Sequence, residues 1–164
     1  MKSLVVYYSF EGNTKFVAET IAQKIGADLL ALKPKKEIQT HGFMKYFWGG
    51  KPATMQETPE LLPLEKNPSE YDLIFIGTPV WAFTFTPPLR SFFTSQKLKG
   101  KKIALFCCHG GRMAKTLEKM KEHVIGNDII GEIDFREPLK NNATQAAEKA
   151  QQWAKEMIQN MKNP

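Results

Sequence analysis

The chain has 164 residues, of which 42% are hydrophobic and 24% are charged. This composition is typical of a globular protein and excludes a disordered or fibrous chain, and the length suits a single domain. No apolar run approaches the roughly 18 residues that a membrane span requires. We therefore expect no membrane partner and, from the short apolar run that follows Met1, no signal peptide.

Apolar runs and helical spacings alternate along the chain. The runs that predict buried strands cover residues 4–8, 27–32, 72–77, 102–107 and 129–135. The spacings that predict helices cover residues 17–25, 87–96 and 113–126, and a last helix begins near Asn142. Short strands separated by helices indicate an α/β fold, with a five-stranded parallel sheet in the order 2-1-3-4-5 and helices on both faces.

Residues 33–68 interrupt this alternation. Phe43, Tyr46, Phe47 and Trp48 crowd a proline-containing stretch that has little sustained periodicity. The pattern predicts an irregular excursion over the surface of one domain spanning residues 1–164. The segment Phe43–Trp48 could wall a substrate pocket, form a homodimer contact or simply pack on the surface, and the sequence leaves these alternatives open.

The formal net charge is +6, and the basic residues gather at 97–102 and again from Arg112 to Lys121. An excess of positive charge is compatible with binding to an acidic partner, with binding to a nucleic acid or simply with a well-solvated surface. Because the basic residues are not interleaved with aromatic residues as in a known nucleic-acid module, we expect a solvated basic face and no nucleic-acid partner.

The two cysteines, Cys107 and Cys108, are neighbours in the sequence. Adjacent Cα atoms are about 3.8 Å apart, whereas a disulfide prefers about 4.4–6.8 Å. We therefore predict two reduced thiols, which favours a cytoplasmic location.

Ligands of such a sheet bind at the carboxyl ends of the strands, where the strand order reverses. After the first strand, Ser9–Thr14 leads directly into a helix, whose N-terminus offers unpaired N–H groups and a partial positive charge. Gly12 allows close approach of an anion, and Ser9, Asn13 and Thr14 add donors. The loop predicts either a phosphate site or an ordinary helix cap, and its pattern excludes a nucleotide-hydrolysing P-loop.

Two later loops reach the same edge. Residues 78–84 carry Trp81, which offers a flat face for stacking an aromatic ring unless it folds inward as part of the core. Residues 107–112 carry two glycines, His109 and Arg112. They predict either a loop that hydrogen-bonds the polar edge of a flat heterocycle or a flexible turn. Together the three loops offer what a phosphorylated, flat heterocycle would need.

The three loops resemble those of the flavodoxin family. Residues 8–14 are similar to its phosphate loop, 77–81 with 87–90 to its second flavin loop, and 106–111 to its third. The resemblance covers residues 1–32 and 72–153, and it implies FMN bound at the strand-order switch point. Two features depart from the family: Glu11 stands in place of the usual threonine, and the chain is basic where electron-carrier flavodoxins are acidic.

The resemblance also implies the residues of the site. Residues 9–14 would hold the phosphate, 78–83 would flank the ring, and 108–111 would contact its pyrimidine edge. The implied FMN-binding residues are Ser9, Phe10, Glu11, Gly12, Asn13, Thr14, Thr78, Pro79, Val80, Trp81, Ala82, Phe83, Cys108, His109, Gly110 and Gly111. If Arg112 faces the ring, its positive charge should raise the reduction potential.

Two functions follow from the resemblance. The first is an FMN-binding protein that carries electrons between partner proteins. The second is an FMN-dependent reductase that takes hydride from a nicotinamide and passes electrons to a quinone or a similar small acceptor. A response-regulator receiver is set aside because it needs an acidic pair where this chain has Tyr8 and Ser9.

Overall fold

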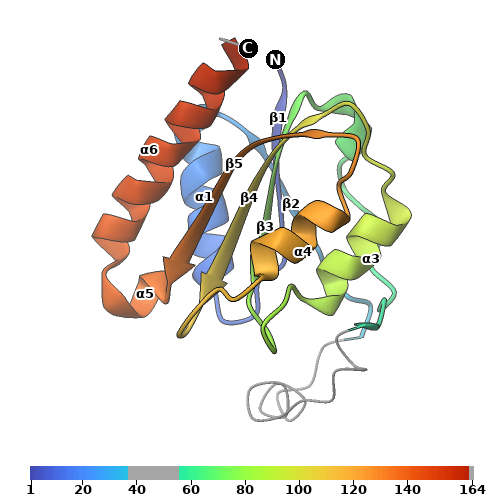
Figure 1. Cartoon of the computed structure of the whole chain (residues 1–164), viewed down its shortest axis with the longest axis horizontal. Coiled ribbons are helices and arrows are strands. Elements are labelled where there is room, and N and C mark those ends of the chain that lie inside the picture. The colour runs from blue at the N-terminus through green and yellow to red at the C-terminus, as the bar shows by residue number, and fades with distance from the viewer. Residues whose placement is uncertain (37–55, 163–164) are drawn as a thin grey trace.

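The computed structural model describes residues 1–36 and 56–162. The strands form one parallel sheet in the order β2-β1-β3-β4-β5 (Figure 1). The strands are β1 (Ser3–Tyr7), β2 (Asp28–Ala31), β3 (Leu73–Pro79), β4 (Lys102–His109) and β5 (Asp128–Arg136). The helices are α1 (Asn13–Ile25), η2 (Pro68–Glu70), α3 (Pro87–Ser95), α4 (Thr116–Glu122), α5 (Pro138–Asn141) and α6 (Ala143–Lys162). The predicted fold class and strand order are confirmed.

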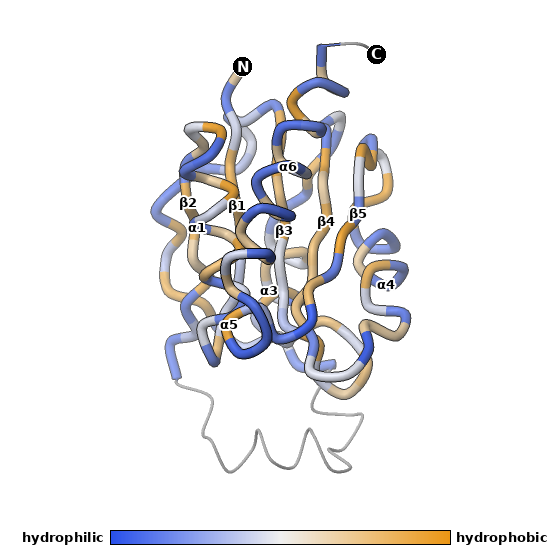
Figure 2. Tube along the Cα trace, turned by 90° about the vertical axis from the view of Figure 1, so that its left-hand side faces the viewer, coloured by the Kyte–Doolittle hydropathy of each residue, from blue (hydrophilic) through white to orange (hydrophobic). Residues whose placement is uncertain are grey.

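The central strands are buried on both faces, which explains why they appear as continuous apolar runs. In β3 every residue from Leu73 to Thr78 is buried, and in β4 every residue from Ile103 to Cys108 is buried. Figure 2 shows the mostly hydrophobic strand β4 behind the mostly hydrophilic helix α6.

The helices form two layers, one on each face of the sheet. α3 and α4 cover one face, where Leu89, Phe92 and Met120 join the core, and α1 and α6 cover the other (Figure 1). The predicted buried side of α6 is confirmed by Ala150, Trp153 and Met157, while Ala146 and Met161 are only partly buried. No helix in the described ranges is both long enough and apolar enough to cross a membrane.

The structure corrects the predicted helix over 113–126. α4 begins only at Thr116, because Ala114 has a positive φ of 50° that a right-handed helix does not allow. Met113, predicted on the buried face of this helix, lies before it and is 38% exposed. The short helix α5 was not predicted, since four residues are too few to show a helical period.

The described ends of the 33–68 excursion pair with each other. Pro34 forms an antiparallel bridge with Leu61, and the Lys35 amide donates to the Glu60 carbonyl oxygen at 2.8 Å. Side-chain ion pairs of Lys33 with Glu65 and of Lys35 with Glu60 strengthen this pairing. The excursion therefore leaves and rejoins the domain at one place, and the predicted aromatic segment at 43–48 lies outside the described residues.

Candidate functional site

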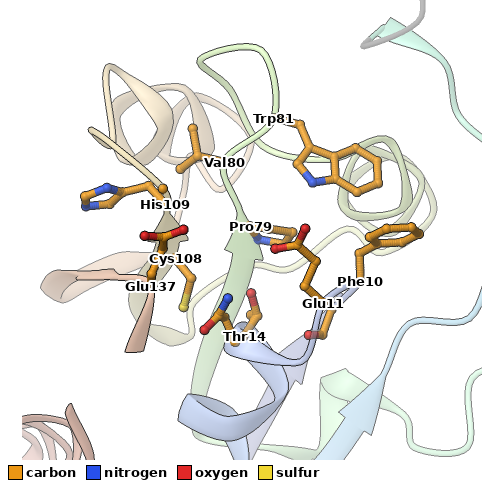
Figure 3. Close-up of a pocket in the computed structure, with 12 residues that line it drawn as sticks. Phe10, Glu11, Thr14, Pro79, Val80, Trp81, Cys108, His109 and Glu137 are labelled. Carbon is orange, nitrogen blue, oxygen red and sulfur yellow. The ribbon is translucent and has the colours of Figure 1, made fainter. Parts of the chain in front are cut away.

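A pocket lies at the carboxyl edge of the sheet, between the loops that follow β1, β3 and β4 (Figure 3). It is lined by Ser9, Phe10, Glu11, Asn13, Thr14, Pro79, Val80, Trp81, Cys108, His109, Gly110 and Glu137. Three loops that are far apart in the sequence thus meet at the point where the strand order reverses, as the sequence predicted. A backbone hydrogen bond from the Val80 amide to the Cys108 carbonyl oxygen, 2.8 Å long, joins the second loop to the third.

The loop after β1 turns sharply into α1. Gly12 is the N-cap and has a φ of 99°, a left-handed conformation that glycine adopts without strain. No side chain caps the helix, and its first turn has no acidic residue. The first N–H groups of α1 therefore keep their capacity to bind an anion.

Asn13, the first residue of α1, connects this loop to α5. Its side-chain oxygen accepts a hydrogen bond from the Leu139 amide at 3.1 Å. Because the oxygen is engaged, the NH₂ group is the part of this side chain that remains to donate to a ligand. The Leu139 side chain also lies 3.6 Å from the position that a Cβ at Gly12 would take, so α5 supports the loop from outside.

Thr14 carries an unpaired hydroxyl. The residue is 1% exposed, and its Oγ1 has no hydrogen-bond partner of ordinary geometry among the described residues. The Cys108 thiol lies beside it and interacts with it only weakly, since a thiol is a poor donor. A buried hydroxyl without a hydrogen-bond partner lowers the stability of the fold. At a helix N-terminus, such a hydroxyl is suited to donate a hydrogen bond to an anionic ligand.

Both cysteines are free and buried, in agreement with the predicted reduced thiols. Burial raises the pKa of the Cys108 thiol to about 12, and burial likewise raises the pKa of Cys107. Cys108 therefore contributes a neutral, apolar wall to the pocket and does not act as a nucleophile at neutral pH.

The loop after β3 contains a tight turn. Trp81 and Thr84 exchange two backbone hydrogen bonds of 2.9 and 3.0 Å, and the two residues between them, Ala82 and Phe83, both have positive φ, at 46° and 64°. These are the features of a type I′ turn, which normally holds asparagine or glycine. The turn therefore carries backbone strain and places Phe83 at its tip, where it is 58% exposed.

Trp81 is not an exposed platform. It is 2% exposed, and its ring meets the rings of Tyr8 and Phe10 edge to face, with centroids 5.7 Å apart in each case. Of the two alternatives that the sequence left open, the structure shows the inward one, but Trp81 still lines the pocket from within the aromatic cluster (Figure 3).

The end of β4 places His109 against β5. Its Nε2 lies 2.8 Å from an Asp134 carboxylate oxygen, and its Nδ1 is buried without a partner among the described residues. The His109 carbonyl oxygen accepts a hydrogen bond from the Glu137 amide at 2.9 Å. Arg112 does not line the pocket, because its guanidinium lies over the Phe83 ring, 5.3 Å from the centroid.

Comparison with known proteins decides the family. A family model of flavodoxins matches residues 2–157. The chain belongs to the flavodoxin family. No curated protein matches the sequence closely enough to count as a relative.

Solved structures agree with this flavodoxin assignment. A flavoprotein of Lactobacillus acidophilus, crystallised in complex with FMN, is 25% identical with a TM-score of 0.65, and the match covers 87% of this chain and 98% of that one. A protein of Bacteroides uniformis is 20% identical with a TM-score of 0.77, covering 94% and 97%. The flavodoxin of Megasphaera elsdenii is 23% identical with a TM-score of 0.58, covering 93% and 98%.

Not every residue that the flavodoxin resemblance implied faces the pocket. Gly12, Thr78, Ala82, Phe83 and Gly111 are not among its lining residues. The Thr78 hydroxyl lies 3.2 Å from the Thr86 hydroxyl and accepts from the Thr86 amide at 3.2 Å, so it fixes the entry into α3. Gly12 acts through its backbone conformation, as described above.

Glu137 lines the pocket although sequence reasoning missed it. It follows β5, so the same rule that selected the loops after the other strands would have found it. Glu137 has a φ of 37°, and its carboxylate lies 3.5 Å from the Lys140 ammonium. Glu11 extends toward the pocket from the other side (Figure 3), and the pocket of this flavodoxin thus holds two carboxylates.

Proposed function

We propose that this flavodoxin-family chain binds FMN in the pocket at the carboxyl edge and carries electrons between partner proteins. The observation that carries the proposal is the buried, unpaired Thr14 hydroxyl at the N-terminus of α1, behind the left-handed turn at Gly12. The similar Lactobacillus acidophilus flavoprotein, which was crystallised with FMN, supports the same cofactor.

The residues at the N-terminus of α1 fit a phosphate. The first N–H groups of the helix are neutral donors, and so are the Thr14 hydroxyl, the Asn13 NH₂ group and the Ser9 hydroxyl, whose residues line the same pocket. Such a cup, together with the positive end of the helix dipole, binds a phosphate without a lysine.

The other two loops fit a flat ring system. Pro79, Val80 and Trp81 form one wall, and Cys108 with the backbone of His109 and Gly110 forms another. The neutral thiol and the apolar side chains exclude water, while exposed backbone groups can read the polar edge of a heterocycle. Bound FMN would supply the one- and two-electron redox chemistry, and the chain supplies orientation and electrostatics.

The charges around the pocket act on this chemistry. Glu11 and Glu137 disfavour additional negative charge in the pocket, and Arg112 lies outside it over Phe83. We therefore expect the two carboxylates to affect the potential of the bound cofactor more than Arg112 does. The sequence-based prediction for Arg112 applied only if Arg112 faces the ring, and Arg112 lies over Phe83 instead.

The carrier role is preferred to the reductase role. The pocket is lined almost entirely by the three loops that fit the cofactor itself. The segment that could wall a separate substrate pocket, residues 43–48, lies outside the described residues.

A titration tests cofactor binding. FMN added to the apoprotein should lose its fluorescence at a one-to-one ratio, and riboflavin, which lacks the phosphate, should bind at least about 100-fold more weakly because it forfeits several charge-assisted hydrogen bonds. Equal affinity for riboflavin and FMN would show that the Thr14 cup does not hold a phosphate.

A turnover assay separates the carrier from the reductase. The FMN-loaded protein should accept electrons from an added reductase and pass them to ferricyanide, but should not oxidise NADH or NADPH steadily in the presence of a quinone. Steady nicotinamide oxidation by the purified protein would overturn the carrier role and establish the reductase.

A further inference from the structure

The strained turn at the edge of the pocket exposes an aromatic ring. Phe83 is 58% exposed, and both it and Ala82 hold positive φ values that are strained for residues other than glycine. Such strain is found at binding sites, where the strained backbone holds a side chain in the position that binding requires. Phe83 is only two residues from Trp81, so it lies beside the pocket without lining it.

Two positively charged side chains contact Phe83. The Arg112 guanidinium lies over the Phe83 ring at 5.3 Å, and the Lys119 ammonium lies 3.5 Å from the Phe83 carbonyl oxygen. Lys115, the N-cap of α4, accepts a backbone hydrogen bond from Lys119 and so lies one turn away from it. We call Phe83, Arg112, Lys115 and Lys119 the basic rim.

The cations of the basic rim are not neutralised by their surroundings. None of Arg112, Lys115 and Lys119 forms a salt bridge with a described residue. Lys121 is paired with Glu132 at 2.8 Å, and the pKa of this lysine is raised mainly by that hydrogen bond and to a smaller extent by the charge of Glu118, in the first turn of α4. The rim therefore projects net positive charge, in keeping with the +6 of the whole chain.

An apolar centre with a charged margin is the usual anatomy of a protein interface. Two copies of this chain meeting about a two-fold axis at the rim would bring the same cations together, so the rim disfavours a second copy. Two cations in contact with Phe83 and a third one helical turn away also form a smaller array of charge than the long row of phosphates in a nucleic-acid backbone would need. The remaining occupant is a protein with a complementary negative surface.

We propose that the basic rim is the docking site for an acidic redox partner protein. The assignment of a redox role to that partner rests on the proposed function. The rim would hold the partner directly beside Trp81 and the pocket, with Phe83 buried at the centre of the contact. Charge complementarity of this kind increases the association rate and makes it depend on salt.

Binding of a defined acidic probe tests the proposal. The probe is a fluorescently labelled plant-type [2Fe–2S] ferredoxin, which is strongly acidic, and binding is followed by anisotropy with both FMN-free and FMN-loaded protein. We expect micromolar binding at about 0.01 M salt that weakens steadily toward about 0.5 M, as the screening length falls. Cytochrome c, a basic protein, should not bind at either salt concentration.

Matched variants locate the contact. Arg112→Gln with Lys115→Gln removes two rim charges and should weaken ferredoxin binding about tenfold at low salt. Lys97→Gln with Lys99→Gln removes two exposed charges near the amino end of β4 and should change affinity less than about twofold. Phe83→Asn removes the ring but keeps a residue that suits a positive φ, and should weaken binding about fivefold at every salt concentration.

The outcomes separate the two proposals. If ferredoxin binds FMN-free protein and the rim variants lose affinity, docking stands even where FMN fails to bind, and only the redox assignment falls. Docking is overturned if ferredoxin does not bind, or if the rim and control variants behave alike. It is also overturned if a DNA duplex or anionic vesicles bind more tightly than ferredoxin and lose affinity in the same variants.

Discussion

The two ends of the sheet are built differently. Where helices lead back into strands, at the amino end, the positive φ values belong to Gly26, Gly100 and Gly126. Where strands lead out, at the carboxyl end, Gly12 is joined by four residues that adopt a positive φ at a cost. These four are Ala82, Phe83, Ala114 and Glu137.

Polar groups that are buried or partly buried show the same contrast. At the amino end, Asn127 makes three side-chain hydrogen bonds, accepting from the Lys101 amide and donating to the carbonyl oxygens of Leu98 and Val124. At the carboxyl end lie the buried side-chain atoms that have no partner within the described ranges. They are Oγ1 of Thr14, Thr84 and Thr116 and Nδ1 of His109.

The contrast teaches which end serves stability and which serves binding. Backbone strain and unpaired polar groups lower the stability of a fold. They therefore persist mainly at sites where a function, such as ligand binding, compensates for the loss. One end of this sheet has turn residues suited to their conformations and a fully paired asparagine. The other gives up stability along the edge that holds the pocket and the basic rim. The four predictions that follow test this division.

The largest effect should come from Asn127→Ala at the amino end. The change removes three hydrogen bonds and leaves the Lys101 amide without its acceptor, so the free energy of unfolding should fall by about 2–4 kcal/mol. Denaturant titration measures this loss. Asn141→Ala, which removes a single exposed bond to the Arg136 carbonyl oxygen, is the control and should cost less than about 1 kcal/mol. Equal losses would contradict the division.

Thr14→Val at the carboxyl end should separate binding from stability. Valine keeps the shape of threonine and removes the unpaired hydroxyl, so the free energy of unfolding should stay the same or rise by up to about 1 kcal/mol. FMN affinity should fall about tenfold, which corresponds to about 1.4 kcal/mol.

Thr20→Val is the matched control for Thr14 on the same helix. The Thr20 hydroxyl donates to the Phe16 carbonyl oxygen at 2.8 Å, away from the pocket. This variant should leave FMN affinity unchanged. A Thr14 variant that loses stability without losing FMN affinity would show that the hydroxyl serves the fold.

Ala82→Gly and Gly26→Ala should shift stability in opposite directions. Glycine at position 82 relieves a positive φ of 46° and should raise the free energy of unfolding by about 0.5–1 kcal/mol. A Cβ at position 26 would meet no atom within 4 Å, but a φ of 66° is strained for alanine. Gly26→Ala should therefore lower the free energy of unfolding by about 1 kcal/mol. Thermal and denaturant unfolding measure the stability change of each variant. Changes of the same sign would refute the contrast between the two ends of the sheet.

The sequence predicted the fold well because its strands are buried on both faces and its helices on one. Burial explains the continuous apolar runs in β3 and β4. It also explains the helical spacing of Ala150, Trp153 and Met157 in α6. The three pocket loops followed from the topology, and the family resemblance named their residues.

Other features carried no local signal. Ala82, Phe83 and Glu137 adopt conformations against their own preferences, and only the surrounding structure imposes them. The inward position of Trp81 depends on the rings of Tyr8 and Phe10, which no spacing in the sequence relates to it. The start of α4 was placed too early because Met113 happens to continue the helical period of Leu117 and Met120.

The smallest effect should come from Glu11→Gln, which tests how far the binding end departs from the family pattern. Glu11 lies at the pocket and is exposed, so solvent screens most of its repulsion of a phosphate. Removing the charge should tighten FMN binding about twofold to threefold at low salt and hardly at all at about 0.5 M salt, where the screening length is only a few ångströms. Glu118→Gln, the same change at an exposed residue of α4, should leave FMN affinity unaltered. A Glu11 variant that binds FMN more weakly would mean that the carboxylate itself supports the ligand, and the substitution of glutamate for threonine would then be a functional adaptation of this loop.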